Sequence, residues 1–123
     1  MSSLSWSEVF AVHRSRRGIG EQSLLVDRGE SGYRNLFLAD GRILYMGEGR
    51  RGHQEPLGGN LRLLLAYREG KPLRVFLRER PGLWRDLGLY RVEAFRYELW
   101  SEEGRYVYWF TLAPGGCAEA PSG

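Results

Sequence analysis

Residues 45–76 read YMGEGRRGHQEPLGGNLRLLLAYREGKPLRVF, and this stretch decides the fold that we expect. It begins as a short apolar strand, continues through a loop rich in glycine, and then takes on a helical pattern. Asn60 is placed to cap that helix, three leucines then fall on one of its faces, and Gly70 can end it. After Pro72 the side chains alternate as they do in a strand. The sequence therefore predicts one clear helix, at about residues 60–69, between two strands.

Runs of β-forming residues on both sides of this stretch predict further strands. With the strand after Pro72, the expected strands cover residues 7–13, 22–27, 42–46, 73–78, 89–97 and 105–112. Asp40-Gly41 is a hairpin signal. A small curved sheet or barrel is the natural way to bury so many strands with one helix. We therefore expect a single α+β, mainly β domain over residues 1–113, followed by a disordered tail at 114–123.

The composition excludes several classes of protein. The 123 residues fit one domain, and no apolar run approaches the ~20 residues that span a membrane. Residues 1–12 lack the charged start and apolar stretch of a signal peptide, so we expect a cytoplasmic protein without a membrane partner. Cys117 is the single cysteine, and His13 and His53 lie far apart in the sequence, so we expect no disulfide, no metal and no cofactor.

The basic residues are almost all arginine. Of the 18 basic residues 17 are Arg, although the formal net charge is only +3. The guanidinium group offers a planar fork of donors that suits phosphates and guanine edges. A GC-rich genome would also favour arginine, so the composition alone leaves nucleic-acid binding open.

No local motif indicates catalysis. The sequence shows no arrangement of Ser, His and Asp, and the glycine-rich residues 47–59 lack the lysine and serine of a phosphate-binding loop. A pair of acids in that loop, Glu48 and Glu55, is usually just solvated. We therefore expect a protein that is not itself an enzyme.

A second group of residues is aromatic and basic. Tyr33 and Tyr45 could stack a base that has left its helix, Asn35 could read its edge, and Arg50 and Arg51 could hold phosphates. Glycines let the backbone approach such a ligand closely. The alternative is that both tyrosines simply pack in the core of an aromatic-rich β domain.

The order of these motifs resembles the SRA family. Residues 45–76 are similar to its central block, which runs from a tyrosine-threonine-glycine motif through a glycine-rich loop and a glycine-asparagine helix start to a Gly-x-Pro turn. LGLYRV at Leu87–Val92 resembles a later strand, and GYRNLFLADGRILYMGEG at Gly32–Gly49 looks closest to SRA-like domains of bacterial modification-dependent HNH endonucleases. The likeness runs from about His13 to Leu112. It implies a PUA-like twisted β barrel that binds duplex DNA and flips 5-methylcytosine or a related base into a pocket.

The resemblance also implies which residues hold the base. Two tyrosines sandwich it in the family; Tyr45 matches one of them, and Tyr33, twelve residues earlier, falls where the other is expected. Met46 stands where threonine is usual, and Leu36 falls near the acid that reads the edge of cytosine in readers of hemimethylated DNA. The loop at residues 49–53 is too short for the long finger of those readers, so sensing of hemimethylation is not expected. The HNH motif is absent from these 123 residues.

Together these arguments give the expected site, partners and alternatives. The base pocket comprises Tyr33, Asn35, Asp40, Tyr45, Met46, Gly47 and Glu48. The nucleic-acid backbone is contacted by Arg14, Arg16, Arg17, Arg34, Arg50, Arg51 and His53. The expected partner is double-stranded DNA with a modified base, and a separate nuclease would complete a role in restriction of modified phage DNA. Two alternatives stay open: a PUA-like RNA-binding module, and a small nucleotide-processing enzyme that uses Glu48 or His53.

Overall fold

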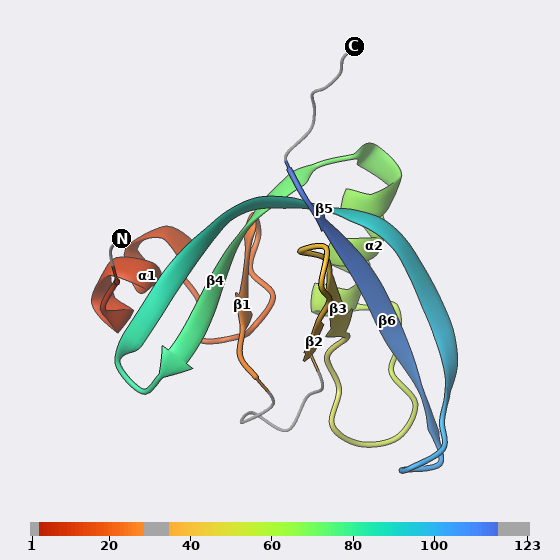
Figure 1. The fold of residues 1–123 in the computed structure, drawn as a ribbon. Helices are drawn as coiled ribbons and strands as arrows, with labels where there is room; N and C mark the ends of the chain where they lie inside the picture. The colour runs from red at the N-terminus through yellow and green to blue at the C-terminus, as the bar shows by residue number, and fades with distance from the viewer. Residues whose placement is uncertain (1–2, 29–34, 116–123) are drawn as a thin grey trace.

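The computed structural model describes residues 3–28 and 35–115. They form the helices α1 (Trp6–His13) and α2 (Gly58–Glu69) and the strands β1 (Ser23–Val26), β2 (Asn35–Phe37), β3 (Ile43–Met46), β4 (Pro72–Arg80), β5 (Leu83–Trp100) and β6 (Arg105–Pro114) (Figure 1). All these strands join one sheet in the order β1-β4-β5-β6-β3-β2. β1 and β4 run parallel, and the other neighbours are antiparallel. The expected α+β, mainly β fold is confirmed.

The sheet is strongly curved because β5 serves both of its halves. The first part of this long strand pairs with β4 and the second part with β6, and the pairing with β6 contains a bulge between Val92 and Ala94. Figure 1 shows that the strand bends along its length. β1 and β2 are the two edge strands. The curvature brings these edges together, since the amide of Asn35 donates to the carbonyl of Asp27 at 3.3 Å. The barrel that we expected is thus a six-stranded open sheet whose edges meet through a side chain rather than through a backbone ladder.

Helix α2 confirms the helix expected at about residues 60–69, with a different start. It begins at Gly58 after the N-cap residue Leu57, which makes no capping bond through its side chain. Asn60 therefore lies inside the first turn and is not the cap. Gly70 ends the helix as expected, in a left-handed conformation with φ 68°, and its N–H donates to the carbonyl of Ala66.

Helix α1 corrects the expectation of a strand at residues 7–13. Ser5 and Glu8 form a capping box in which each side chain bonds the backbone of the other, and this arrangement starts a helix. Val9 and His13, four residues apart, lie on the buried face of α1. The helix covers a small core of Val9, Phe76 and Trp84.

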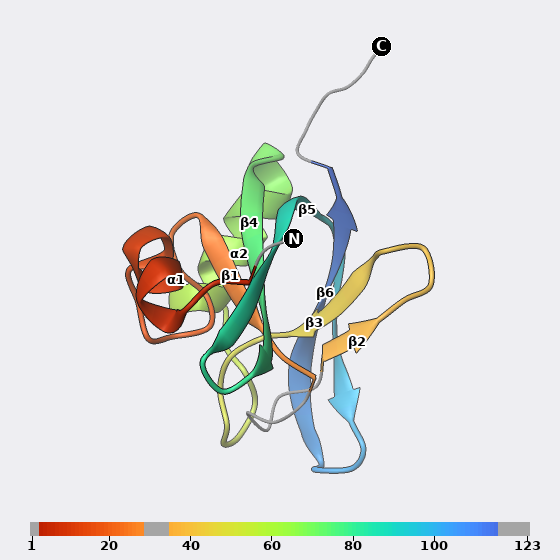
Figure 2. The ribbon, with the colours of Figure 1, turned by 60° about the vertical axis from the view of Figure 1, so that its left-hand side comes forward.

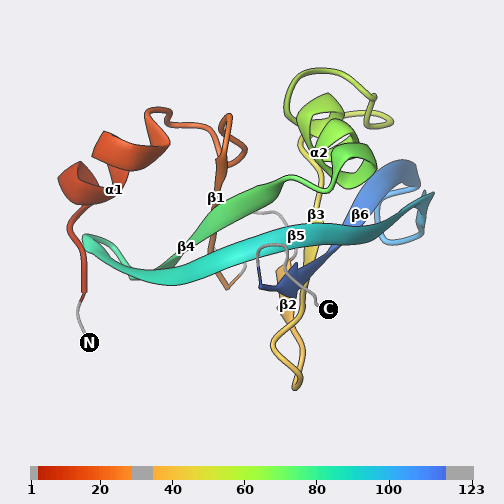
Figure 3. The same cartoon turned by 90° about the horizontal axis from the view of Figure 1, so that it is seen from above.

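The main core lies between the curved sheet and α2. Its fully buried members include Leu24, Ile43, Leu63, Val75 and Phe110. Seen from above, α1 and α2 lie on the same side of β5 (Figure 3), whereas β2 and β3 extend away from α1 (Figure 2). Within the described residues, neither helix is long and apolar enough to cross a membrane.

Candidate nucleic-acid interface

A cavity of about 1140 Å³ opens between segments that are far apart in the sequence. Its wall is formed by the loop after α1, the ends of β1 and β3, the start of β2, the glycine loop at residues 47–57 and the turn between β4 and β5. Across the described residues, no group of three or more His, Cys, Asp or Glu side chains could hold a metal ion.

The cavity brings together most of the expected base-pocket residues. Five of the seven line it: Asn35, Tyr45, Met46, Gly47 and Glu48. Tyr33 lies outside the described residues, so the sandwich of two tyrosines stays a prediction. Asp40 is not part of the wall, because it lies exposed in the turn between β2 and β3. Its carboxylate accepts hydrogen bonds from the backbone and guanidinium of Arg42, which hold its pKa below the usual value. Asp40 is thus engaged in a local turn rather than placed to read a base.

The expected backbone contacts divide in a similar way. Five of them line the cavity: Arg16, Arg17, Arg50, Arg51 and His53. Arg14 does not line it and instead caps the C-terminus of α1 with a left-handed backbone, φ 61°. Arg34 lies outside the described residues. The mouth of the cavity therefore carries guanidinium groups from two separate loops, an arrangement that suits a polyanion.

Tyr45 combines a structural position with a place in the cavity wall. Its side chain is only 5% exposed and belongs to the main core. The phenol donates to the carbonyl of Leu25 on β1 at 3.3 Å, so it also ties β3 to the edge strand β1. A Cβ on Gly18 would lie 2.9 Å from the phenol oxygen, so this glycine lets the loop after α1 pass close to the ring. The reading of Tyr45 as a core residue is therefore right for most of its ring, and the remainder faces the cavity.

Asn35 offers an acceptor at the wall. Its amide nitrogen donates to the carbonyl of Asp27, which fixes the orientation of the amide group. The oxygen Oδ1 is buried and has no hydrogen-bond partner in the structure of the described residues. A buried acceptor without a partner costs about 1–3 kcal/mol.

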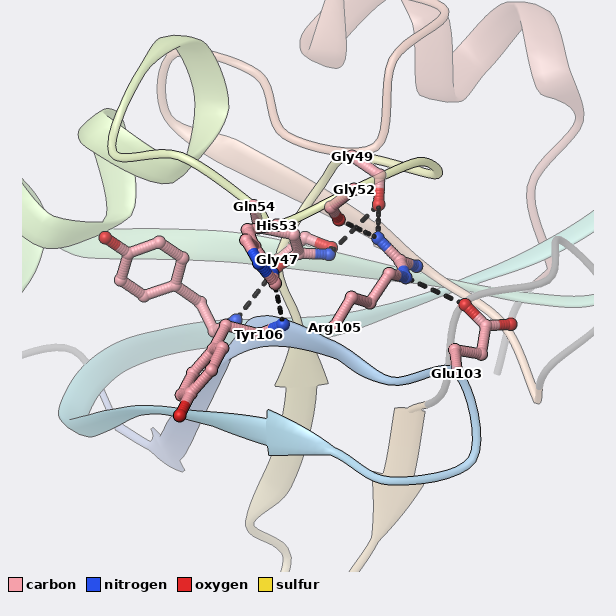
Figure 4. A network of polar contacts seen from close by, with 9 residues as sticks. Gly47, Gly49, Gly52, His53, Gln54, Glu103, Arg105 and Tyr106 are labelled. Carbon is pink, nitrogen blue, oxygen red and sulfur yellow. Dashed lines mark hydrogen bonds and ion pairs between the residues drawn. The ribbon is translucent and has the colours of Figure 1, made fainter.

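Buried Gln54 fastens the glycine loop to β6. Its Nε2 donates to the carbonyls of Gly47 and Gly49, and its Oε1 accepts from the N–H of Tyr108. Arg105, at the start of β6, donates to the carbonyls of Gly49 and Gly52 (Figure 4). These bonds give a loop without regular structure a defined path along the cavity.

His53 belongs to the same anchoring network. Its Nδ1 accepts a hydrogen bond from the N–H of Tyr106, and the two rings contact edge to face (Figure 4). The imidazole is exposed and lies at the mouth of the cavity. His53 therefore helps to hold the loop, whatever contact it makes with a ligand.

Asn60 and Glu48 join the same loop to α2. The Asn60 amide accepts from the N–H of Glu48 and donates to the carbonyls of Glu48 and Glu55. The carboxylate of Glu48 in turn accepts from the N–H of Gly59 in the first turn of α2, where negative charge is favoured. A Cβ on Gly47 would lie 2.5 Å from Asn60 Oδ1, so only glycine fits there.

Buried His13 anchors the loop after α1 that carries Arg16 and Arg17, which we call the arginine loop. Its Nε2 donates to the carbonyl of Arg17 and its Nδ1 accepts from the hydroxyl of Ser23, both at 2.6 Å. Burial lowers the pKa of His13, which favours the neutral form that this pattern requires. The loop that carries Arg16 and Arg17 is thus tied to both α1 and β1.

One part of the wall was not expected from the sequence. Trp6 from α1, Arg78 from β4 and Trp84 from β5 line the end of the cavity next to the turn Pro81-Gly82. The Pro-Gly pair is a turn signal that could have been noticed. Its connection to Trp6, more than seventy residues away, exists only in the folded chain.

Comparison with known proteins fits this arrangement. Residues 18–118 match the family described as ScoMcrA-like, SRA domain. Among curated proteins, none matches the chain. The fold resembles that of SUVH5 SRA in its complex with methylated CHH DNA, with 27% identity, a TM-score of 0.75 and coverage of 94% of this chain and 88% of that one. SUVH5 SRA bound to fully hydroxymethylated CG DNA gives 26% identity, a TM-score of 0.73 and coverage of 94% and 86%.

A restriction enzyme shares the fold. The modification-dependent restriction endonuclease TagI is similar over 92% of this chain and 48% of its own, with a TM-score of 0.74 and 23% identity. The family match covers most of the sequence and the whole cavity wall apart from Trp6, Arg16 and Arg17. The chain belongs to the SRA domain family, in its ScoMcrA-like branch.

Proposed function

We propose that this chain binds duplex DNA and holds one modified base, 5-methylcytosine or a related base, flipped out of the helix and into the cavity. The observation that carries the proposal is the cavity itself, in which Asn35, Tyr45 and Met46 meet beneath a mouth lined by arginines. The SUVH5 relatives are SRA domains in complex with methylated and hydroxymethylated DNA, which supports the same ligand class here. Cleavage of the DNA is left to a separate nuclease.

The energetics of flipping are compatible with this wall. Taking a base out of the stack costs a few kcal/mol, and stacking on an aromatic ring returns about 1–3 kcal/mol. Tyr45 supplies one ring, and Tyr33 is proposed as the second. The arginines of the two loops, Arg16, Arg17, Arg50 and Arg51, would bind phosphates and contribute affinity without reading sequence.

The edge of the base would be read by the free acceptor of Asn35. Cytosine and adenine carry an exocyclic amino group that can donate to Oδ1, whereas thymine presents a carbonyl oxygen there and would leave two acceptors facing each other. Met46 is 2% exposed and adds an apolar, polarisable chain to the wall near the base. A methionine side chain can contact a substituent on the ring, but it has no group that donates a hydrogen bond.

A titration with matched duplexes tests the proposal. Fluorescent duplexes that carry cytosine, 5-methylcytosine or 5-hydroxymethylcytosine at one position should bind with different affinities at a fixed salt concentration. Tyr45→Ala and Tyr33→Ala should each remove this discrimination. Equal, strongly salt-dependent binding to all three duplexes would mean that the chain is a non-specific DNA binder.

Two further arms separate the alternatives. Single-stranded RNA of matched sequence should compete poorly, and better competition by RNA than by DNA would favour the RNA-binding module. Prolonged incubation with the modified duplex, or with nucleosides, should leave both intact. Release of a product would show that Glu48 or His53 takes part in catalysis.

A further inference from the structure

The cavity extends beyond the residues that would hold a flipped base. At the end next to the β4–β5 turn, its wall consists of Trp6, Arg78, Pro81 and Trp84, which we name the hairpin wall. None of these residues belongs to the expected base pocket. The cavity has a volume of about 1140 Å³, whereas pockets for whole drug-sized ligands measure about 300–1,000 Å³. A single base in the expected base pocket would therefore leave the space next to the hairpin wall unfilled.

The hairpin wall is held rigidly. Arg78 and Trp84 are paired across β4 and β5, so their side chains leave the same face of the hairpin. Trp84 is 7% exposed and belongs to the small core beneath α1. Trp6 packs against it with ring centroids 5.5 Å apart. Arg78 therefore projects from a packed aromatic surface rather than from a loose loop.

The charge of Arg78 is available to a ligand. On the opposite face of the hairpin, Arg28 and Arg85 both form ion pairs with Glu79. In the structure of residues 3–28 and 35–115, no ion pair joins Arg78 to a carboxylate. On that face the guanidinium groups share a carboxylate, whereas among the described residues the face toward the cavity presents a cation beside indole rings without one.

A cation next to the partly exposed ring of Trp6 suits a nucleotide, which combines a phosphate with a flat base and a sugar. We propose that the hairpin wall binds the nucleotide next to the flipped base, with Arg78 on its phosphate and the ring of Trp6 against its sugar or base. This inference rests on the proposed function, because it extends the same DNA footprint from the glycine loop to the β4–β5 hairpin.

Arg78→Gln in the full chain provides the first test. Loss of one phosphate contact should lower the slope of log K against log salt by about 0.9, which corresponds to roughly eightfold weaker binding at 0.1 M salt. Modified and unmodified duplexes should lose the same factor, so the discrimination between them should persist. Arg85→Gln is the matched control, since it removes the same charge from the same hairpin on the opposite face. It should change affinity less than twofold.

Neutral linkages in the DNA locate the contact. A methylphosphonate replaces one phosphate at a time on either side of the modified base. At one position the substitution should weaken the wild-type chain about eightfold and leave Arg78→Gln unaffected, because the two changes remove the same contact. If every neutral linkage costs both proteins equally, or if the two arginine variants behave alike, the hairpin wall does not bind the strand.

The outcomes distinguish this inference from the proposed function. Wild-type protein that fails to discriminate modified DNA would remove the base-reading proposal, while the neutral-linkage comparison would still report whether Arg78 touches DNA.

Arg78→Lys keeps the charge on a flexible chain and should retain most of the salt slope, so it serves if the glutamine variant does not fold. A lysine variant with the reduced slope would also contradict a phosphate contact.

Discussion

Replacing Gln54 with leucine should destabilise the protein more than its loop position suggests. Gln54 is 2% exposed, and its side chain bonds Gly47, Gly49 and Tyr108. Leucine has a similar size, so the change removes the polar atoms and leaves little cavity. The carbonyl of Gly49 keeps its bond from Arg105, whereas the carbonyl of Gly47 and the N–H of Tyr108 lose their side-chain partner.

The magnitude follows from those two orphaned groups. A buried polar group without a partner costs about 1–3 kcal/mol, so Gln54→Leu should lower the free energy of unfolding by about 2–6 kcal/mol. Small domains are stable by only about 5–15 kcal/mol in total. The variant should therefore be marginally folded, and the glycine loop should lose its fixed path before the rest of the sheet does.

Urea unfolding, followed by tryptophan fluorescence, measures the effect. The matched control is His53→Ala in the adjacent position, which removes an exposed bond to Tyr106 that water can replace. That control should cost no more than about 0.5–1.5 kcal/mol. An unchanged slope against urea would show that both values refer to the same unfolding reaction. If Gln54→Leu is within 1 kcal/mol of the control, the loop is not held by this amide and the reasoning fails.

Three further predictions concern the other anchors. Gly47→Ala forces a methyl group against Asn60 and should cost about 1–3 kcal/mol in urea unfolding. Tyr45→Phe loses only the bond to Leu25, so it should cost about 0.5–1.5 kcal/mol and keep discrimination between modified and unmodified duplexes, measured by titration. Burial lowers the pKa of His13 in the folded chain below the ordinary value of about 6.5, so the unfolded chain binds a proton more readily. The free energy of unfolding should therefore fall as the pH drops below about 6.5. His13→Gln should remove this dependence when the free energy of unfolding is measured against pH.

Local signals in the sequence were sufficient for the elements whose burial repeats with a simple period. Helix α2 and strands β3, β4 and β6 were each located to within a few residues. Strand β5 begins six residues earlier and ends three residues later than the expected residues 89–97. In the structure the Asp86 carboxylate accepts from the N–H of Gly88, and the strand continues because β4 pairs along this part of it. Pairing with the preceding strand of the same hairpin thus overrode the local preference.

Helix α1 was misread because its composition and its start signal disagree. Its sequence SEVFAVH places Val9 and Val12 among apolar residues, which favours a strand. The spacing of Ser5 and Glu8 is that of a capping box, and this signal was available but not used. A bonded helix start satisfies backbone donors that an isolated strand would leave open. The cap therefore decides the structure of a segment whose side chains alone are ambiguous.

The same distinction explains what could be predicted of the site. Four of the pocket residues are consecutive, so a sequence motif that identifies one of them as part of the pocket identifies the others as well: Tyr45, Met46, Gly47 and Glu48. The hairpin wall could not be found in this way, since it depends on the approach of α1 to the β4–β5 turn. Asp40 was expected as a substitute for the acid that reads cytosine in the family, but in the structure its carboxylate is bonded to the backbone and guanidinium of Arg42.

Three buried polar side chains give the cavity its shape. His13 holds the arginine loop, Gln54 holds the glycine loop against β6, and Asn60 holds that loop against α2. Each of them bonds a backbone group in a segment that has no regular structure. Each therefore occupies a buried position with a polar side chain and fixes the path of a loop in return. Loops that are already fixed before a ligand arrives do not have to be ordered on binding, which would subtract from the affinity. These anchors are therefore distinct from Asn35, Tyr45 and Met46, the residues that we propose to read the base, and their role is to fix where the two loops lie.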